Sequence, residues 1–213
     1  MIEAAPSRRD ARYPLLLLGV FAVVFVVLGV APAMREDWLL ENVIVVAAVA
    51  WLIWGWRRLP LSNGAYTLLF VFGLFHEIGA HYQYSDVPYD AWIARLTGGH
   101  SLDAWLGFER NQFDRFVHFL YGLLVTPAAA EVIAARVKPR GMWLFLLPVT
   151  FMMSHAVIYE LVEWLAASVF GGELGEAYLG TQGDGWDAQK DMALAALGSL
   201  IVQPAWMALR ARR

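Results

Sequence analysis

The chain has 213 residues, which could make one or two soluble domains, but its composition argues against a soluble fold. Hydrophobic residues make up 59% of the chain, charged residues make up 16%, and the mean hydropathy is +0.51. A soluble domain carries about 45–50% apolar and about 25% charged residues. The net charge of −3 gives no reason to expect a nucleic-acid partner, and the absence of cysteine excludes disulfides and thiolate chemistry. We therefore expect a protein that is solvated mostly by membrane lipid.

Six stretches in chain order are apolar and long enough to cross a bilayer, which takes roughly 20 residues of helix. The connections 57–63 and 136–140 are short, so the helices that they join should pack antiparallel. We predict an all-α polytopic membrane protein, a six-transmembrane-helix bundle that forms a single integral membrane domain over 1–213. The expected spans cover about 13–31, 38–56, 64–82, 116–135, 141–169 and 188–209.

The distribution of lysine and arginine predicts the orientation of this bundle. With six spans, both termini and the connections 57–63 and 136–140 share one side, which holds eleven of the sixteen basic residues. Cytoplasmic segments carry the excess of basic residues, so both termini should be cytoplasmic. A competing interpretation is a signal peptide cleaved after 31–33. The first apolar run is about 19 residues, longer than the roughly 7–15 of a signal peptide, which favours a retained span.

Ionisable residues within the spans gather near the expected outer ends of four helices. Such residues are rare inside membranes and are functional candidates by default. Many are spaced four apart, as Asp114 and His118 are, and therefore share a helix face. The four groups, in chain order, are His76, Glu77, His81 and Tyr84; Arg110, Asn111, Asp114, Arg115 and His118; His155, Tyr159, Glu160 and Glu163; and Gln182, Asp184, Asp187, Lys190 and Asp191.

Carboxylate and imidazole groups on facing helices are how helical bundles hold metal ions. His76 and His81 are five residues apart, so they point in different directions and do not form the metalloprotease motif. We predict a divalent metal held by His81, His118 and His155, with Glu77 as a further ligand. The predicted catalytic residues are Glu160, Glu163, Asp184 and Asp187, and the predicted ligand-binding residues are Arg110, Asn111, Asp114, Arg115, Tyr159, Gln182, Lys190 and Asp191.

The two connections at the expected outer side have distinct patterns. In 83–113, apolar residues recur at helical spacing in 92–96 and 102–106, which predicts short amphipathic pieces lying in the membrane interface. An aromatic belt anchor is the alternative interpretation. The segment 171–185 contains six glycines and is predicted to be a freely bending loop near a ligand.

Several of these motifs together resemble the YjdF-like bacterial inner membrane proteins. The resemblance is carried by Tyr178-Leu-Gly-Thr-Gln-Gly-Asp-Gly-Trp-Asp-Ala-Gln-Lys-Asp-Met192 and by His155 with Tyr159-Glu-Leu-Val-Glu-Trp164. It extends from about 64 to 209 and implies a multi-pass protein of the bacterial inner membrane without implying an activity. The segment 114–119 is also similar to an Asp-Lys-x-x-His-Phe segment of VanZ-like membrane proteins, with Arg115 in place of the lysine.

Three classes of function stay open from the sequence. The first is an outward-facing polar pocket that binds a lipid-linked or envelope small molecule, or hydrolyses it with a metal-activated water and Glu160 or Glu163 as the base. The second is an ion- or proton-coupled transporter that uses the same acids as a relay. The third is a structural or sensory membrane protein in which the polar network only clamps the helices. Membrane lipid is the expected partner, and neither the substrate nor the oligomeric state is specified by the sequence.

Overall fold

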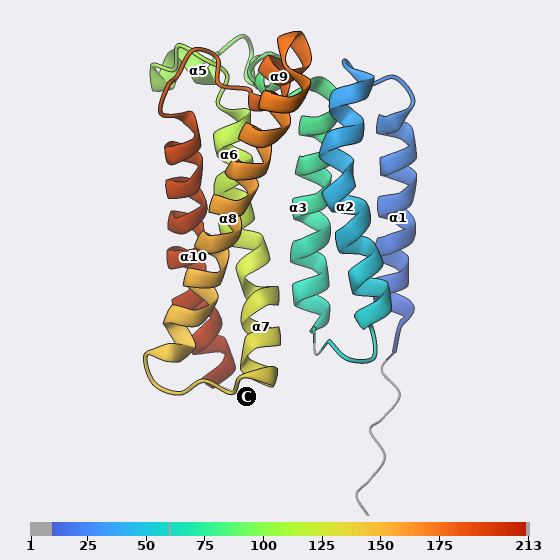
Figure 1. The fold of residues 1–213 in the computed structure, drawn as a ribbon, viewed down its shortest axis with the longest axis vertical. Coiled ribbons are helices and arrows are strands. Elements are labelled where there is room, and N and C mark those ends of the chain that lie inside the picture. The colour runs from blue at the N-terminus through green and yellow to red at the C-terminus, as the bar shows by residue number, and fades with distance from the viewer. Residues whose placement is uncertain (1–9, 60, 212–213) are drawn as a thin grey trace, which may run out of the picture.

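The computed structural model describes residues 10–59 and 61–211, and this part of the chain is helical and contains no strand. The long helices run side by side along one axis of the molecule (Figure 1). Each predicted span corresponds to a helical segment. These segments are α1 (Arg12–Gly29), α2 (Arg35–Gly55), α3 (Asn63–Tyr82), a continuous unit of α6 (Phe113–Leu120), η2 (Tyr121–Val125) and α7 (Thr126–Arg136), then α8 (Trp143–Phe170) and α10 (Asp187–Ala211).

Five helical segments among the described residues are long and apolar enough to cross a membrane. They are α1, α2, the unit from Phe113 to Arg136, α8 and α10. Helix α3 has 20 residues, about 30 Å of helix, but it is too polar to meet the same criterion. Its last two turns carry His76, Glu77 and His81, and it packs against α1, α2, α6 and η2. The polar residues of α3 therefore point largely into the bundle, where His76 and Glu77 are buried.

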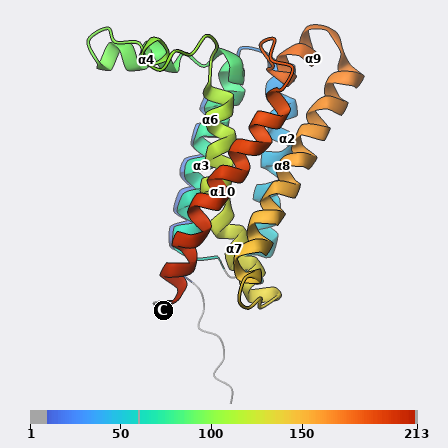
Figure 2. The ribbon, with the colours of Figure 1, turned by 90° about the vertical axis from the view of Figure 1, so that its left-hand side faces the viewer.

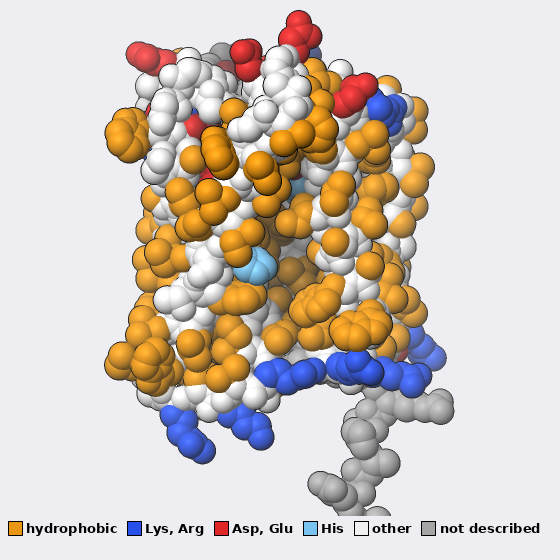
Figure 3. Space-filling model, in the orientation of Figure 1, with side chains coloured by type: hydrophobic (Ala, Val, Ile, Leu, Met, Phe, Trp, Pro, Cys, Tyr) orange, Lys and Arg blue, Asp and Glu red, His pale blue; other side chains and the backbone are white. Residues whose placement is uncertain are grey.

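The outside of the bundle is apolar and its two ends differ in charge. Hydrophobic side chains cover its flank, while Asp and Glu gather at one end and Lys and Arg at the other (Figure 3). Residues such as Leu15, Val26 and Trp164 are more than 60% exposed on long helices, as a lipid-facing surface requires. We call the end that carries α4, α5 and α9 the acidic end, and the opposite end the basic end.

Two short helices, α4 (Tyr89–Leu96) and α5 (Leu102–Leu106), occupy the pieces for which the sequence predicted helix. They project sideways from the acidic end (Figure 2). The Tyr89 hydroxyl donates a hydrogen bond to Asp103 (2.5 Å), and burial raises the pKa of Tyr89 to about 12. The Asp90 carboxylate accepts from the backbone N–H of Leu102 (2.6 Å), which fixes α5 against α4.

The glycine-rich segment before α10 differs from its prediction as a bending loop, because part of it is the helix α9 (Gly172–Leu179). Good helix formers lie between its glycines, in the order Gly-Glu-Leu-Gly-Glu-Ala-Tyr-Leu. A Cβ at Gly175 would lie 2.9 Å from the carbonyl oxygen of Ala167, so only glycine lets α9 fold back onto the end of α8. The helix ends at Gly180, which has a left-handed φ of 58°.

Helices α6 and α10 approach each other more closely than ordinary side chains would allow. A Cβ at Gly122 would lie 1.9 Å from the carbonyl oxygen of Ala195, and a Cβ at Gly198 would lie 2.3 Å from that of Phe119. Beside them the Thr126 hydroxyl donates to the Ser199 hydroxyl (2.9 Å). Small residues at such contacts are how membrane helices pack backbone to backbone. The backbone takes a π-helical turn, η2, at this point.

Candidate metal centre

A network of ion pairs joins the start of α6 to the start of α10 at the acidic end. Arg110 donates two hydrogen bonds to Asp187, of 2.7 and 3.3 Å, and Arg115 donates to the same carboxylate at 2.9 Å. Asp184 accepts from Arg115 and from Lys190 (2.5 Å). We call these five residues the clasp. Three cations face two carboxylates in it, so its acids are fully neutralised.

The loop that carries Asp184 is held to the clasp by further hydrogen bonds. Arg110 donates to the carbonyl oxygen of Thr181 (2.8 Å). Asn111 and Gln182 exchange two bonds, because the Asn111 N–H donates to the Gln182 side chain (3.0 Å) and the Gln182 amide donates back to the Asn111 carbonyl (3.1 Å). The hydrogen bond from Lys190 lowers the pKa of Asp184 below its ordinary value. The predicted ligand-binding residues Arg110, Asn111 and Gln182 thus contact protein groups.

Next to the clasp lies a second group of acids without such neutralisation. His118 Nε2 lies 3.5 Å from Asp114 Oδ1 and 3.7 Å from Glu160 Oε1. Ligand atoms of Asp114, His118 and Asp191 all lie within 4.8 Å of one another. Three helices contribute, since Asp114 and His118 are on α6, Glu160 is on α8 and Asp191 is on α10. We call these four residues the inner cluster.

The close packing of α6 on α10 explains why the inner cluster forms. Asp114, His118 and Gly122 are spaced four apart on one face of α6 and η2. Asp191 and Ala195 are spaced four apart on α10. Because Gly122 contacts Ala195 directly, the residues one turn nearer the acidic end, His118 and Asp191, must also face each other.

Polar atoms of the inner cluster lack partners in the described part of the chain. Asp191 is 2% exposed and its Oδ1 accepts no hydrogen bond, and Oε1 of Glu160 accepts none. No lysine or arginine among the described residues forms an ion pair with Asp114, Glu160 or Asp191. Buried carboxylates without partners are costly in free energy, so this cluster requires protons or a bound cation.

Helices α2 and α3 bring further acids to the same end. The Tyr159 hydroxyl of α8 donates to Glu41 of α2 at 3.0 Å. Glu77 of α3 is fully buried and neither of its carboxylate oxygens has a hydrogen-bond partner. Asp37 is 2% exposed, one helical turn before Glu41. Neither Asp37 nor Glu41 is among the predicted site residues, although their spacing of four was the available signal.

One buried pair involves an imidazole. The His76 Nδ1 and the Tyr84 hydroxyl lie 2.5 Å apart, and a Cβ at Gly79 would overlap the Tyr84 ring. Burial raises the pKa of Tyr84 well above its ordinary value, so the phenol is neutral and can share a proton with His76. The chain turns at this pair, from the end of α3 toward α4 and α5.

The structure does not bring the three predicted histidine ligands together. His155 is exposed on α8, and its ring lies 4.5 Å from that of Phe151. His81 Nδ1 lies 2.7 Å from the carbonyl oxygen of Leu28 and ties α3 to α1. Of the three, only His118 belongs to the inner cluster. The predicted catalytic residues Asp184 and Asp187 belong to the clasp, where both form ion pairs.

The groups of the inner cluster suit a divalent cation. Carboxylate oxygens and imidazole nitrogens are ligands of Zn²⁺, Mn²⁺ and Fe²⁺, at about 2.0–2.2 Å from zinc. Two ligands of one such ion lie up to about 4 Å apart, close to the separations found here. Small side-chain rotations would bring Asp114, His118 and Asp191 to one ion, with Glu160 as the next carboxylate.

Comparisons with known proteins agree with the membrane architecture. Residues 13–213 match a family described as "Predicted membrane protein (DUF2238)". The chain is 33% identical to "Inner membrane protein YjdF" of Escherichia coli over 179 residues, which are 84% of this chain and 81% of that protein. No solved structure matches. Together with the five apolar helices, these matches support a multi-pass location in the inner membrane.

Proposed function

Because the chain belongs to the DUF2238 family of membrane proteins, we propose that it binds a divalent cation at the acidic end and acts there on a lipid-linked or envelope substrate. The observation that carries the proposal is the imbalance of charge in the inner cluster. Asp191 is buried with an unpartnered oxygen beside Asp114 and His118, while the neighbouring cations are already engaged by Asp184 and Asp187.

The proposal includes the six-span topology with both termini in the cytoplasm. Helix α3 is as long as its neighbours and its polar residues are sheltered by α1, α2 and α6, which supports counting it as a span. The Lys and Arg residues at the basic end support a cytoplasmic location for that end. The acidic end would then open to the outside of the cell.

Metal-assisted hydrolysis is the chemistry that this site would suit best. A divalent cation supplies charge for a phosphoryl or carbonyl oxygen and lowers the pKa of a water. Asp114, His118 and Asp191 would hold the ion. Glu160 lies 3.7 Å from His118 and would accept the proton. Glu163 lies one turn further along α8, buried, and would support Glu160.

A coupled transporter is less well supported, because it needs a polar path through the basic half. Two of the polar side chains of that half, Glu131 and Gln203, are used for packing. Glu131 accepts from the N–H and the hydroxyl of Ser62, at 2.6 Å each. Gln203 donates to the carbonyl oxygen of Leu144 at 2.8 Å. The acids of α2 and α3 would therefore enlarge the site rather than extend it across the membrane.

Metal analysis of the purified protein tests the proposal. We expect about one equivalent of a divalent cation by mass spectrometry after metal-supplemented growth, removable with a chelator. Asp191→Asn and His118→Gln should each lose it. Asp184→Asn is the matched control, because Asp184 lies in the same region but contacts Arg115 and Lys190. Equal metal content in all variants, or no metal in any, would overturn the proposal.

A further inference from the structure

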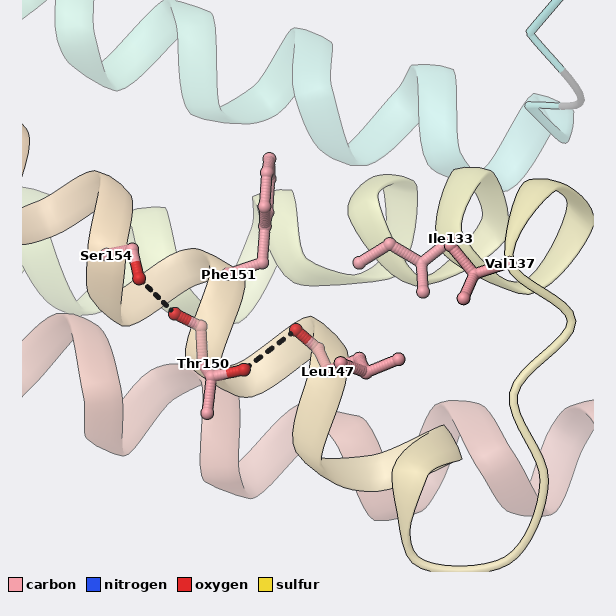
Figure 4. A pocket seen from close by; sticks show the side chains of 6 residues that line it. All are labelled: Ile133, Val137, Leu147, Thr150, Phe151 and Ser154. Carbon is pink, nitrogen blue, oxygen red and sulfur yellow. Dashed lines mark hydrogen bonds between the residues drawn. The ribbon is translucent and has the colours of Figure 1, made fainter.

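A second site of different chemistry lies toward the basic end, between α7 and α8. It is an open groove of about 320 Å³. Figure 4 shows α7 and α8 contributing its walls. Leu147 and Ser154 are seven residues apart, about 10 Å along α8. The groove is lined by Ile133, Val137, Leu147, Thr150, Phe151 and Ser154.

The lining of this groove presents almost no free polar group. The Ser154 hydroxyl donates to the carbonyl oxygen of Thr150, and the Thr150 hydroxyl donates to that of Leu146, at 2.8 Å each (Figure 4 shows the first of these). Phe151 is 43% exposed and Val137 is 62% exposed. The groove therefore suits a hydrocarbon chain, and in a membrane-embedded flank the available hydrocarbon is that of a lipid.

Basic residues lie next in the sequence to the lining residue Val137, at the end of the groove that we call its mouth. Arg136 and Lys138 flank the lining residue Val137, and Arg140 follows in the same connection. Arg136 donates to the carbonyl oxygen of Arg58, which ties this connection to the one between α2 and α3. Within the described part of the chain, none of these cations forms an ion pair with a carboxylate. Figure 3 shows the row of Lys and Arg at this end.

We infer that the groove binds one acyl chain of an anionic phospholipid, whose phosphate is held by Lys138, Arg140 and Arg136 at the mouth. The general excess of Lys and Arg in cytoplasmic segments explains why these cations are present, but it does not explain why an apolar groove begins beside them. Basic pockets next to membrane helices favour anionic head groups, at about 1 kcal/mol for each Lys or Arg. A zwitterionic lipid would fill the groove and leave these cations without counter-charge.

Native mass spectrometry with added lipid tests the head-group part of this inference. The detergent-solubilised full chain is titrated with phosphatidylglycerol and with phosphatidylcholine of the same acyl chains. Phosphatidylglycerol should bind more tightly, and Lys138→Gln with Arg140→Gln should weaken it roughly thirtyfold, the equivalent of about 2 kcal/mol. Arg95→Gln, an exposed cation on α4 at the opposite end, is the control and should change nothing.

Filling the groove tests the acyl-chain part. Ser154→Phe should reduce the binding of both lipids, whereas Leu161→Phe, on an exposed position of α8 outside the groove, should not. If the double variant does not fold, added salt replaces it, because screening should weaken only phosphatidylglycerol in the unaltered protein. Equal affinity for the two lipids, or binding insensitive to both the charge change and salt, would overturn the inference.

Discussion

The clasp and the inner cluster lie side by side at the acidic end and both contain buried aspartates, yet the charges of these aspartates are balanced in one and not in the other. In the clasp, Asp187 accepts from two arginines and Asp184 from an arginine and a lysine. In the inner cluster, Asp114 and Asp191 have only His118 between them. Removing one partner from a neutralised network leaves a buried charge unpaired and is destabilising, whereas an unbalanced network requires protons or a bound ligand.

This difference explains why a list of polar residues does not identify a site. Residues of both regions alternate along the same stretches of sequence, as Asp114 and Arg115 do and as Lys190 and Asp191 do. What separates the two regions is which helix face each residue occupies and how many cations reach it. Substitutions that remove a single charge without changing shape can measure that separation.

The largest effect is expected for Asp187→Asn. Asp187 is 3% exposed, and the change leaves the partly buried Arg110 and Arg115 facing a neutral amide. Breaking a buried pair in this way typically costs about 3–5 kcal/mol of the free energy of unfolding. Thermal melts in detergent should show a marked loss of stability. A melt unchanged from that of the unaltered protein would mean that the clasp does not clamp the helices.

A smaller effect is expected for Gly122→Ala, at the helix contact that positions the inner cluster. Gly122→Ala places a methyl group 1.9 Å from a backbone oxygen of α10, so the helices must separate. Overpacking of this kind typically costs about 1–3 kcal/mol. Separation should also lower the affinity for the cation, measured by metal content. Gly19→Ala on α1 is the matched control, because a Cβ there would contact nothing within 4 Å.

Removing a carboxylate from the inner cluster, or from Glu163 beside it, should leave stability almost unchanged. Glu163→Gln and Asp191→Asn keep shape and reduce repulsion between neighbouring carboxylates. In the metal-free protein, the melting temperatures of both variants should match or exceed that of the unaltered chain. Destabilisation equal to that of Asp187→Asn would mean that the clasp and the inner cluster form a single structural network.

The sequence predicted the helices well because each depends on local apolar composition. It also predicted that the acids gather at one end of the bundle, because successive helices alternate in direction and this decides which helix ends meet. A spacing of four could not show that His155 is exposed while Tyr159 contacts Glu41, because it says only that the two residues share a stripe. Glu41 was overlooked because its importance comes from a contact with Tyr159, 118 residues away.

The smallest effect is the dependence of stability on acid pH, and it concerns Asp184 of the clasp. The pKa of Asp184 is lowered in the folded protein, chiefly by its hydrogen bond from Lys190. Its contribution is therefore present in full above the ordinary carboxyl pKa of about 3.9 and is lost as the pH falls toward the lower value of the folded state. The difference in melting temperature between the unaltered chain and Asp184→Asn should be constant from neutral pH to about pH 5 and shrink below it. A difference that grows on acidification would show that the ion pair with Lys190 does not hold Asp184 in its charged form, and would place that carboxylate with the unbalanced acids.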